Sequence, residues 1–356
     1  MGMLTVPDFI ERINELVELT ERLAAVGSPT HDKAAVDSVG AMVAAELRAL
    51  GAAVIVAEQI QTGNHIVARW GWGRDGLLLL GHLDTVLGPD AARLYIDGNR
   101  LYGVGVGDMK GGIAMALVAL RTMRQARQWP LRPITFLLSG DTEQGSRTAQ
   151  PLIEKLARDA AVTLCLEPCL ANGALITSRR GVVGADLVVE GEAAEDELRQ
   201  HLQSLHQLVV ACRDVHLNCD LAGERGGRRV TAHVEASFVS PESGKQIAHW
   251  IRQRVALLAG NSLQVLGSFE RPPLTRTPAI GQAFQRACAL GAALGLKLAE
   301  GDGDWAADAA FVAVRECPLL DGLGAPAEDI RTPAEHIYID QLAERTALLA
   351  AIISEW

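Results

Sequence analysis

The sequence predicts an α/β fold with a smaller inserted α+β segment. Three times along the first half, an apolar strand is followed by an acidic residue or a histidine and then by a helix. This alternation is typical of sheets that carry their functional side chains at the carboxyl ends of the strands. The length of 356 residues suits two domains, and 49% hydrophobic residues supply a core for each.

Charge and hydropathy exclude two classes of partner. The net charge is −10 and no long basic patch occurs, which argues against nucleic acid. No apolar run reaches the ~18 to 20 residues that span a bilayer, so no membrane partner is expected. Residues 6–16 form an acidic amphipathic helix rather than a signal peptide, which predicts a cytoplasmic protein.

The six cysteines predict reduced thiols packed in the core. They lack the paired spacing of a metal cluster, and most of them lie in apolar runs. Their positions are Cys165, Cys169, Cys212, Cys219, Cys288 and Cys317.

Periodicity gives the elements in order. Helices are expected over residues 7–25, 31–50 and 110–127, and strands over 54–56, 66–70, 77–86, 133–138 and 162–166. The strand over 77–86 is apolar enough to be central and covered on both faces. Another helix is expected to end near residue 159.

Near residue 184 the pattern of expected helices and strands changes, and a small α+β insert begins. It has an apolar stretch over 185–190, a helix over 196–212, a glycine-rich stretch over 223–229, a strand near 230–239 and a helix over 243–258. After residues 269–273 the α/β pattern resumes with helices over 279–294 and 340–355, so the first domain is expected to be discontinuous.

A glycine-rich stretch, residues 102–112, places Asp108 on a turn directly before a helix. Such a backbone bends close to something that it must wrap, for which a metal or a phosphate are the usual candidates. A dinucleotide site would need a preceding strand, whereas residues 94–101 are typical of a short hairpin. The stretch therefore argues against a dinucleotide site.

Four nitrogen and oxygen donors lie at the ends of successive elements: His82, Asp108, Glu143 and Glu167. Alone, each has an ordinary structural interpretation, as a strand-end histidine or a capping carboxylate. As an ordered set they suit zinc or a similar divalent metal.

The segments around these donors resemble the zinc peptidases related to glutamate carboxypeptidase, aminoacylase and acetylornithine deacetylase. The similar segments are residues 81–86, 102–112, 141–146, 167–168, 179–181 and 320–324. The resemblance implies a zinc-aminopeptidase-like catalytic domain, residues 1–184 and 272–356. It also implies an inserted α+β lid or dimerisation domain, residues 185–271, which could form a homodimer.

The resemblance also assigns roles. In active relatives a bridging aspartate joins two zinc ions about 4 Å apart, and a glutamate deprotonates the bridging water. Carried over by motif, His82, Asp108 and Glu167 would hold one metal. Asp84 would fix the imidazole of His82, and Glu143 would be the carboxylate on the other metal.

Three departures from the family pattern affect chemistry. Thr142 stands at the general-base position, where a hydroxyl cannot accept a proton from metal-bound water at neutral pH. Arg331 stands where the second metal's histidine belongs, and a guanidinium offers no lone pair. Glu195 replaces the lid histidine and would repel a developing oxyanion. His336 is expected to be an ordinary strand-edge residue rather than a displaced ligand.

Arg331 is expected to pair with Glu143 or Asp108 in place of the second ion, which leaves at most one zinc per chain, or none after purification. Three classes of function stay open: a hydrolase with a reduced site, a pseudoenzyme, and a repurposed acyl-transfer or cyclisation catalyst. Since losing one such catalytic group commonly costs ~10² to 10⁴ in rate, the sequence favours a degenerate metallopeptidase-like protein. It would bind a small N-acyl or peptidyl amino acid without ordinary turnover; an active zinc-dependent carboxypeptidase or deacylase is the alternative.

Overall fold

The computed structural model describes residues 3–222, 228–256, 263–314 and 317–356. These residues form two compact units, each with its own hydrophobic core. The first unit is discontinuous and comprises Met1–Thr177, Arg276–Asp302 and Phe311–Trp356. The second comprises Ser178–Thr275 and Gly303–Ala310.

The first unit alternates helices with strands. Its helices are α1 (Val6–Ile10), α2 (Ile13–Val26), α3 (Lys33–Ala49), α4 (Gly112–Gln125), α5 (Gln150–Arg158), α8 (Pro278–Ala293) and α10 (Leu342–Glu355). Its strands are β1 (Ala53–Ala57), β2 (His65–Trp70), β3 (Gly76–His82), β4 (Tyr95–Asp97), β5 (Arg100–Tyr102), β6 (Ile134–Ser139), β7 (Ala160–Cys165), β14 (Leu319–Leu320), β15 (Ala327–Glu328) and β16 (His336–Tyr338). The elements expected in this part of the chain agree with these bounds to within a few residues, except that the single helix expected over residues 7–25 is divided into α1 and α2.

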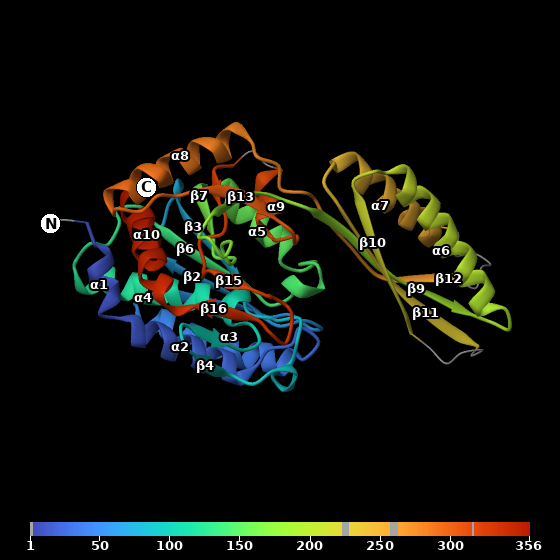
Figure 1. Ribbon diagram of the computed structural model, residues 1–356, viewed down its shortest axis with the longest axis horizontal. Helices are drawn as coiled ribbons and strands as arrows, with labels where there is room; N and C mark the ends of the chain where they lie inside the picture. Colours follow the sequence, from blue (N-terminus) through green and yellow to red (C-terminus); the bar gives the residue numbers. More distant parts are fainter. Residues whose placement is uncertain (1–2, 223–227, 257–262, 315–316) are drawn as a thin grey trace. The chain divides into compact units, whose positions relative to one another are not determined.

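The main sheet of the first unit has the strand order β1-β2-β6-β3-β7-β14. Its inner strands β2, β6, β3 and β7 are labelled in Figure 1. Strand β3 is parallel to both of its neighbours, β6 and β7, and six of its seven residues are buried. The expected central strand is therefore confirmed. Because parallel strands end at the same edge of a sheet, the residues that follow β3, β6 and β7 are brought to one place.

Helix α4 is buried on nearly every side and contacts α2 and α10. The helix expected from residue 110 begins two residues later, at Gly112. The preceding turn, Val106–Gly111, is irregular because Asp108 and Met109 have non-helical backbone angles. This irregular turn sets the direction of the Asp108 side chain.

Gly112 lets α4 begin against the end of β7. A Cβ at Gly112 would lie 2.3 Å from the backbone oxygen of Leu166, the residue before Glu167. Helix propensity alone would make Gly112→Ala stabilising by about 1 kcal/mol. We expect the clash to prevail, so that urea denaturation shows a loss of about 1–3 kcal/mol.

Gly40→Ala in α3 is the matched control, because its new methyl would meet no backbone atom: it would lie 3.2 Å from the tip of the Leu83 side chain and 3.7 Å from that of Ile66. Its change in stability is expected to stay within about 1 kcal/mol. Equal stabilities for the two variants would contradict this account of Gly112.

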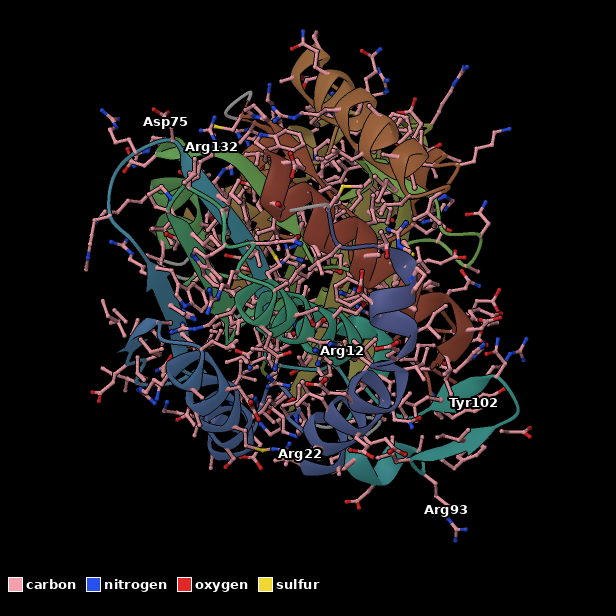
Figure 2. All side chains as sticks on the ribbon, turned by 90° about the vertical axis from the view of Figure 1, so that its left-hand side faces the viewer. Arg12, Arg22, Asp75, Arg93, Tyr102 and Arg132 are labelled. Carbon is pink, nitrogen blue, oxygen red and sulfur yellow. The ribbon has the colours of Figure 1, made fainter. Side chains whose placement is uncertain are left out.

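A small sheet of strand order β15-β16-β5-β4 also belongs to the first unit. The hairpin expected over residues 94–101 is confirmed as β4 and β5, and Tyr102 at its end is labelled in Figure 2. His336 begins β16 and pairs with Tyr102, so its assignment to a strand is also confirmed. This sheet brings the loop between β15 and β16 beside the glycine-rich turn that follows β5.

The second unit is an antiparallel sheet with two helices packed on it. It contains β9 (Gly181–Glu190), α6 (Ala194–Ala211), β10 (Val215–Ala222), β11 (Arg229–Phe238), α7 (Pro241–Ala256) and β12 (Leu263–Arg271). Three elements have residues in both units: β8 (Leu175–Arg179), β13 (Glu300–Gly303) and α9 (Ala309–Ala313). The strand order is β10-β11-β9-β12.

Two strands of the second unit, β10 and β12, were not expected. In β10 the apolar side chains Val215, Leu217 and Leu221 alternate with polar ones, which is the pattern that identifies it. Residues 223–227 of the expected glycine-rich stretch and residues 257–258 of the expected helix lie outside the described residues.

The cysteines are all free, as expected, but only two of them are core residues. Cys165 and Cys169 are buried, Cys212, Cys288 and Cys317 are half-buried, and Cys219 is exposed on the edge strand β10. Within the part of the chain that the structure describes, no helix combines the length and the apolarity needed to cross a membrane.

Candidate metal centre

The four expected donors come from four segments of the first unit. His82 is the last residue of β3, and Glu143 lies in the short helical turn after β6. Glu167 follows β7, and Asp108 lies in the turn before α4. The carboxyl edge of the sheet therefore supplies three donors and the glycine-rich turn supplies the fourth.

The structure brings these donors together around the imidazole of His82. Its Nε2 lies 2.9 Å from Asp108 Oδ1, 3.7 Å from Glu167 Oε1 and 4.0 Å from Glu143 Oε1. Bonds of about 2.0–2.2 Å around a tetrahedral zinc place ligand atoms roughly 3.3 Å apart. The spacing of these atoms fits one metal ion.

The tightest set of donors differs from the set that the family resemblance assigned to the first metal. His82, Asp108 and Glu143 each offer a ligand atom within 4.8 Å of the others. Glu167, which the resemblance placed on the first metal, is near His82 but does not belong to this set. Glu143, which the resemblance assigned to the second metal, belongs to this set.

Arg331 fills the space on the other side of Asp108. Its Nε donates a hydrogen bond to Asp108 Oδ2 at 2.9 Å, and its Nη2 donates one to Glu143 Oε1 at 3.0 Å. The expected pairing is therefore confirmed, with both carboxylates rather than one. Asp108 bridges His82 and Arg331, and a guanidinium, which cannot coordinate a metal, lies between two of the donors.

Asp84 holds both His82 and the turn that carries Glu143. Nδ1 of His82 donates to the backbone oxygen of Asp84 at 2.9 Å and lies 3.5 Å from its carboxylate. That carboxylate accepts the backbone N–H groups of Thr142 and Glu143 at 3.2 and 2.8 Å. Asp84 is therefore placed to orient the imidazole and to fix the turn after β6.

Burial and charge shift the pKa values in opposite directions. Burial lowers the pKa of His82, but hydrogen bonds to Asp108 and Asp84 outweigh it and raise the pKa well above 6.5. Burial raises the pKa of Asp108, but Arg331 and His82 hold it well below its ordinary range. For Glu143, burial outweighs the charge of Arg331, and the pKa is raised to about 7.

The centre carries an excess of negative charge. Five buried or nearly buried carboxylates interact with three cations, which leaves two negative charges when all are ionised. The carboxylates are Asp84, Asp108, Glu143, Glu167 and Glu335, and the cations are His82, Lys110 and Arg331. With His82 neutral, as a metal ligand must be, the excess is three negative charges, and one divalent ion would reduce it to one.

Thr142 and Glu195, the other two residues that depart from the family pattern, both lie among the described residues. Thr142 is buried, and its hydroxyl is hydrogen-bonded to that of Ser139 at 2.7 Å. It precedes Glu143, one of the expected metal ligands. Glu195 lies in the first turn of α6 in the second unit, where it pairs with Arg199 at 3.2 Å. His336 is buried beside Glu328, at 3.5 Å, and is not one of the clustered donors.

Sequence reasoning missed Glu335. Its buried carboxylate accepts the backbone N–H groups of Gly105, Gly107 and Asp108 at 3.1, 2.9 and 3.0 Å. It also accepts the backbone N–H of Arg331 at 3.3 Å. One side chain therefore ties the turn of Asp108 to the loop of Arg331. An acidic residue beside a short apolar strand was the only sequence signal.

Lys110 was missed as well. Its side chain is 1% exposed, and its Nζ donates to Ser28 Oγ at 2.8 Å. Burial lowers the pKa of Lys110 to about 8, while the charges of Glu335 and Asp84 oppose the shift. A lysine among glycines and apolar residues was the available signal.

Known proteins are similar to this chain along most of its length. Carboxypeptidase G2 from Pseudomonas sp. (strain RS-16) is 23% identical over 96% of this chain and 89% of its own. A succinyl-diaminopimelate desuccinylase from Acidiphilium cryptum (strain JF-5) is 28% identical over 80% of this chain and 84% of its own. Human carnosine dipeptidase 1 has a similar fold, with a TM-score of 0.74 at 16% identity over 98% of each chain. The sequence profile of Peptidase family M20/M25/M40 matches residues 78–355, and the chain belongs to that family.

Proposed function

We propose that this protein is a member of the family with a reduced metal site, which binds a small N-acyl or peptidyl amino acid without ordinary peptidase turnover. The observation that carries the proposal is the guanidinium of Arg331, hydrogen-bonded to both Asp108 and Glu143. A permanent cation there repels a second ion and satisfies the carboxylates that would bind it. At most one zinc per chain is therefore proposed.

The remaining donors fit that single ion. His82 Nε2 and Asp108 would hold it together with a glutamate, Glu167 or Glu143, and Asp84 would keep the imidazole in place. A bound zinc would supply a Lewis acid to a substrate oxygen. The excess of negative charge in the centre supports the binding of one divalent ion.

The absence of an ordinary base supports slow chemistry. Thr142 offers only a buried hydroxyl at the base position, and that hydroxyl is engaged with Ser139. Glu195 offers a negative charge where the lid histidine of relatives would stabilise an oxyanion. Each loss alone corresponds to a factor of ~10² to 10⁴ in rate. A pseudoenzyme and a repurposed acyl-transfer or cyclisation catalyst both fit this site.

An active zinc-dependent carboxypeptidase or deacylase is the second candidate, and one observation favours it. The pKa of Glu143, raised to about 7 by burial, lies where a general base works best at neutral pH. Glu143 could take this role only by leaving Arg331, to which it is hydrogen-bonded at 3.0 Å.

A turnover assay separates the two candidates. The substrates are N-acetyl-L-ornithine, N-succinyl-L,L-diaminopimelate and an N-acyl-L-glutamate, with zinc supplied. The second is chosen from the name of a relative, and the other two from the enzymes that the sequence resembles. We expect hydrolysis to be very slow or absent. Turnover at ~1 to 10³ s⁻¹, the ordinary enzyme range, would establish the second candidate instead.

The second unit is proposed to serve as a lid and as a homodimer interface. This proposal rests on its separate core and on its place as an insert in the chain. Molar mass by light scattering tests the dimer, and a monomer at all concentrations would contradict it.

Zinc binding should release protons. The raised pKa of His82 means that its Nε2 carries a proton at neutral pH, and a zinc ligand must be the neutral ring. Affinity for zinc should therefore rise with pH between about 6 and 8. Calorimetric titration in two buffers of different ionisation enthalpy counts the protons released, and a count of zero would contradict the expected protonation of His82.

A further inference from the structure

We propose that Nη1 of Arg331 is the binding site for the amide carbonyl oxygen of the ligand. The inference rests on the proposed function in one respect, namely that the ligand is an N-acyl or peptidyl amino acid. It assigns to Arg331 a direct contact with the ligand, in addition to its pairing with Asp108 and Glu143.

The geometry leaves one edge of the guanidinium open. Arg331 uses Nε on Asp108 and Nη2 on Glu143, and among the described residues no hydrogen bond involves Nη1. The side chain of Arg331 is 27% exposed, whereas those of Asp108 and Glu143 are 2% and 5% exposed. The two carboxylates therefore engage Nε and Nη2, and Nη1 is the nitrogen left to donate a hydrogen bond to a ligand.

The direction of this edge is fixed before any ligand arrives. Two hydrogen bonds hold the planar group to carboxylates on different segments, so that it cannot rotate without breaking one of them. The backbone of Arg331 is held in the left-handed region, with φ of 64°, and its N–H donates to Glu335. Such a conformation in a residue other than glycine persists where the surroundings determine it. A donor fixed in advance binds an oxygen at little entropic cost.

Charge decides which ligand oxygen is bound. The guanidinium already faces two carboxylates, and the centre as a whole carries excess negative charge. A carboxylate of the ligand would add a like charge to this group, whereas a neutral amide oxygen gains the same hydrogen bond without that repulsion. The carbonyl oxygen is therefore the preferred partner of Nη1.

The test combines one variant with two probes of matched shape. Arg331→Lys keeps a cation beside Asp108 and Glu143 but has no nitrogen at the Nη1 position. N-acetylglycine carries the amide, and (E)-pent-3-enoic acid keeps the carboxylate and the extended chain while a C=C bond replaces the amide. Dissociation constants of both probes are measured by calorimetry for the wild type and the variant, with folding checked by thermal denaturation.

We expect the wild type to bind N-acetylglycine about tenfold or more tightly than the alkene, as one hydrogen bond to a charged donor predicts. Arg331→Lys should lose that preference and leave alkene binding unchanged. Equal weakening of both probes would show that Nη1 binds the carboxylate and would overturn the proposal. The proposal would also be overturned if Arg331→Lys bound N-acetylglycine as tightly as the wild type does, or if the wild type did not bind N-acetylglycine.

A crystal structure of the wild type with N-acetylglycine keeps the proposal testable even if Arg331→Lys does not fold. The carbonyl oxygen should lie about 2.9 Å from Nη1, and a carboxylate in that place would overturn the assignment. Failure here is distinct from failure of the proposed function, which is decided by turnover and by metal content.

Discussion

The double substitution Thr142→Glu and Arg331→His should raise the rate of N-acyl amino acid hydrolysis by at least about 10²-fold. Glutamate restores a group that can take a proton from metal-bound water. Histidine removes the cation between Asp108 and Glu143 and supplies a neutral ligand in its place. The measurement is kcat/KM in the presence of zinc, on the substrates of the turnover assay.

The two single variants are the controls. Thr142→Glu alone keeps the cation of Arg331, and Arg331→His alone lacks the base. Each single variant should therefore raise kcat/KM much less than the double variant does. Thermal denaturation must show that all three variants fold, since Thr142 is buried beside Ser139. A folded double variant that binds two metal ions and shows no gain in rate would contradict the role given to position 142.

Arg331→Met should destabilise the protein strongly when a chelator is present. The substitution removes the cation that is hydrogen-bonded to both Asp108 and Glu143, whose side chains are 2% and 5% exposed. It leaves the two carboxylates with His82, whose Nε2 lies 2.9 Å from Asp108 but 4.0 Å from Glu143. Breaking a buried pair costs about 3–5 kcal/mol, and the partial exposure of Arg331 places the expected loss near about 3 kcal/mol. Zinc at about 100 times its Kd should recover roughly 2.7 kcal/mol, because an ion then takes the place of the guanidinium.

Arg276→Met is the matched control. Arg276 pairs with Glu300 at 2.7 Å in the same unit, but their side chains are 45% and 34% exposed. An exposed pair contributes about 0–1 kcal/mol, so this variant should lose little and should not respond to zinc. Equal losses for the two variants would show that Arg331 does not compensate buried charge.

The sequence predicted the part of the centre that follows from strand order. His82 ends an apolar strand and Asp84 lies two residues later, which places both at one sheet edge. The pairing of Arg331 could be predicted because a permanent cation at a metal position must find the carboxylates that the metal would have bound. Both expectations depend on motifs and charge rather than on side-chain distances.

The rest depended on contacts that no local pattern encodes. Glu335 is tied to residues 105–108 by hydrogen bonds to backbone N–H groups, which carry no side-chain signature. Glu143 rather than Glu167 belongs to the set whose ligand atoms all lie within 4.8 Å of one another, which depends on side-chain distances that sequence spacing does not resolve. The edge strand β10 does carry an alternating apolar pattern, but it also contains Asn218 and Asp220, residue types that are uncommon in strands.

The metal content of the purified, zinc-supplemented protein tests the central proposal most directly. Elemental analysis gives the number of ions per chain, and anomalous scattering from a crystal gives their positions. Because Arg331 is hydrogen-bonded to Asp108 and Glu143, we predict at most one zinc per chain, bound by His82 and Asp108. Two fully occupied zinc ions about 4 Å apart, both bound to Asp108, would contradict the proposal.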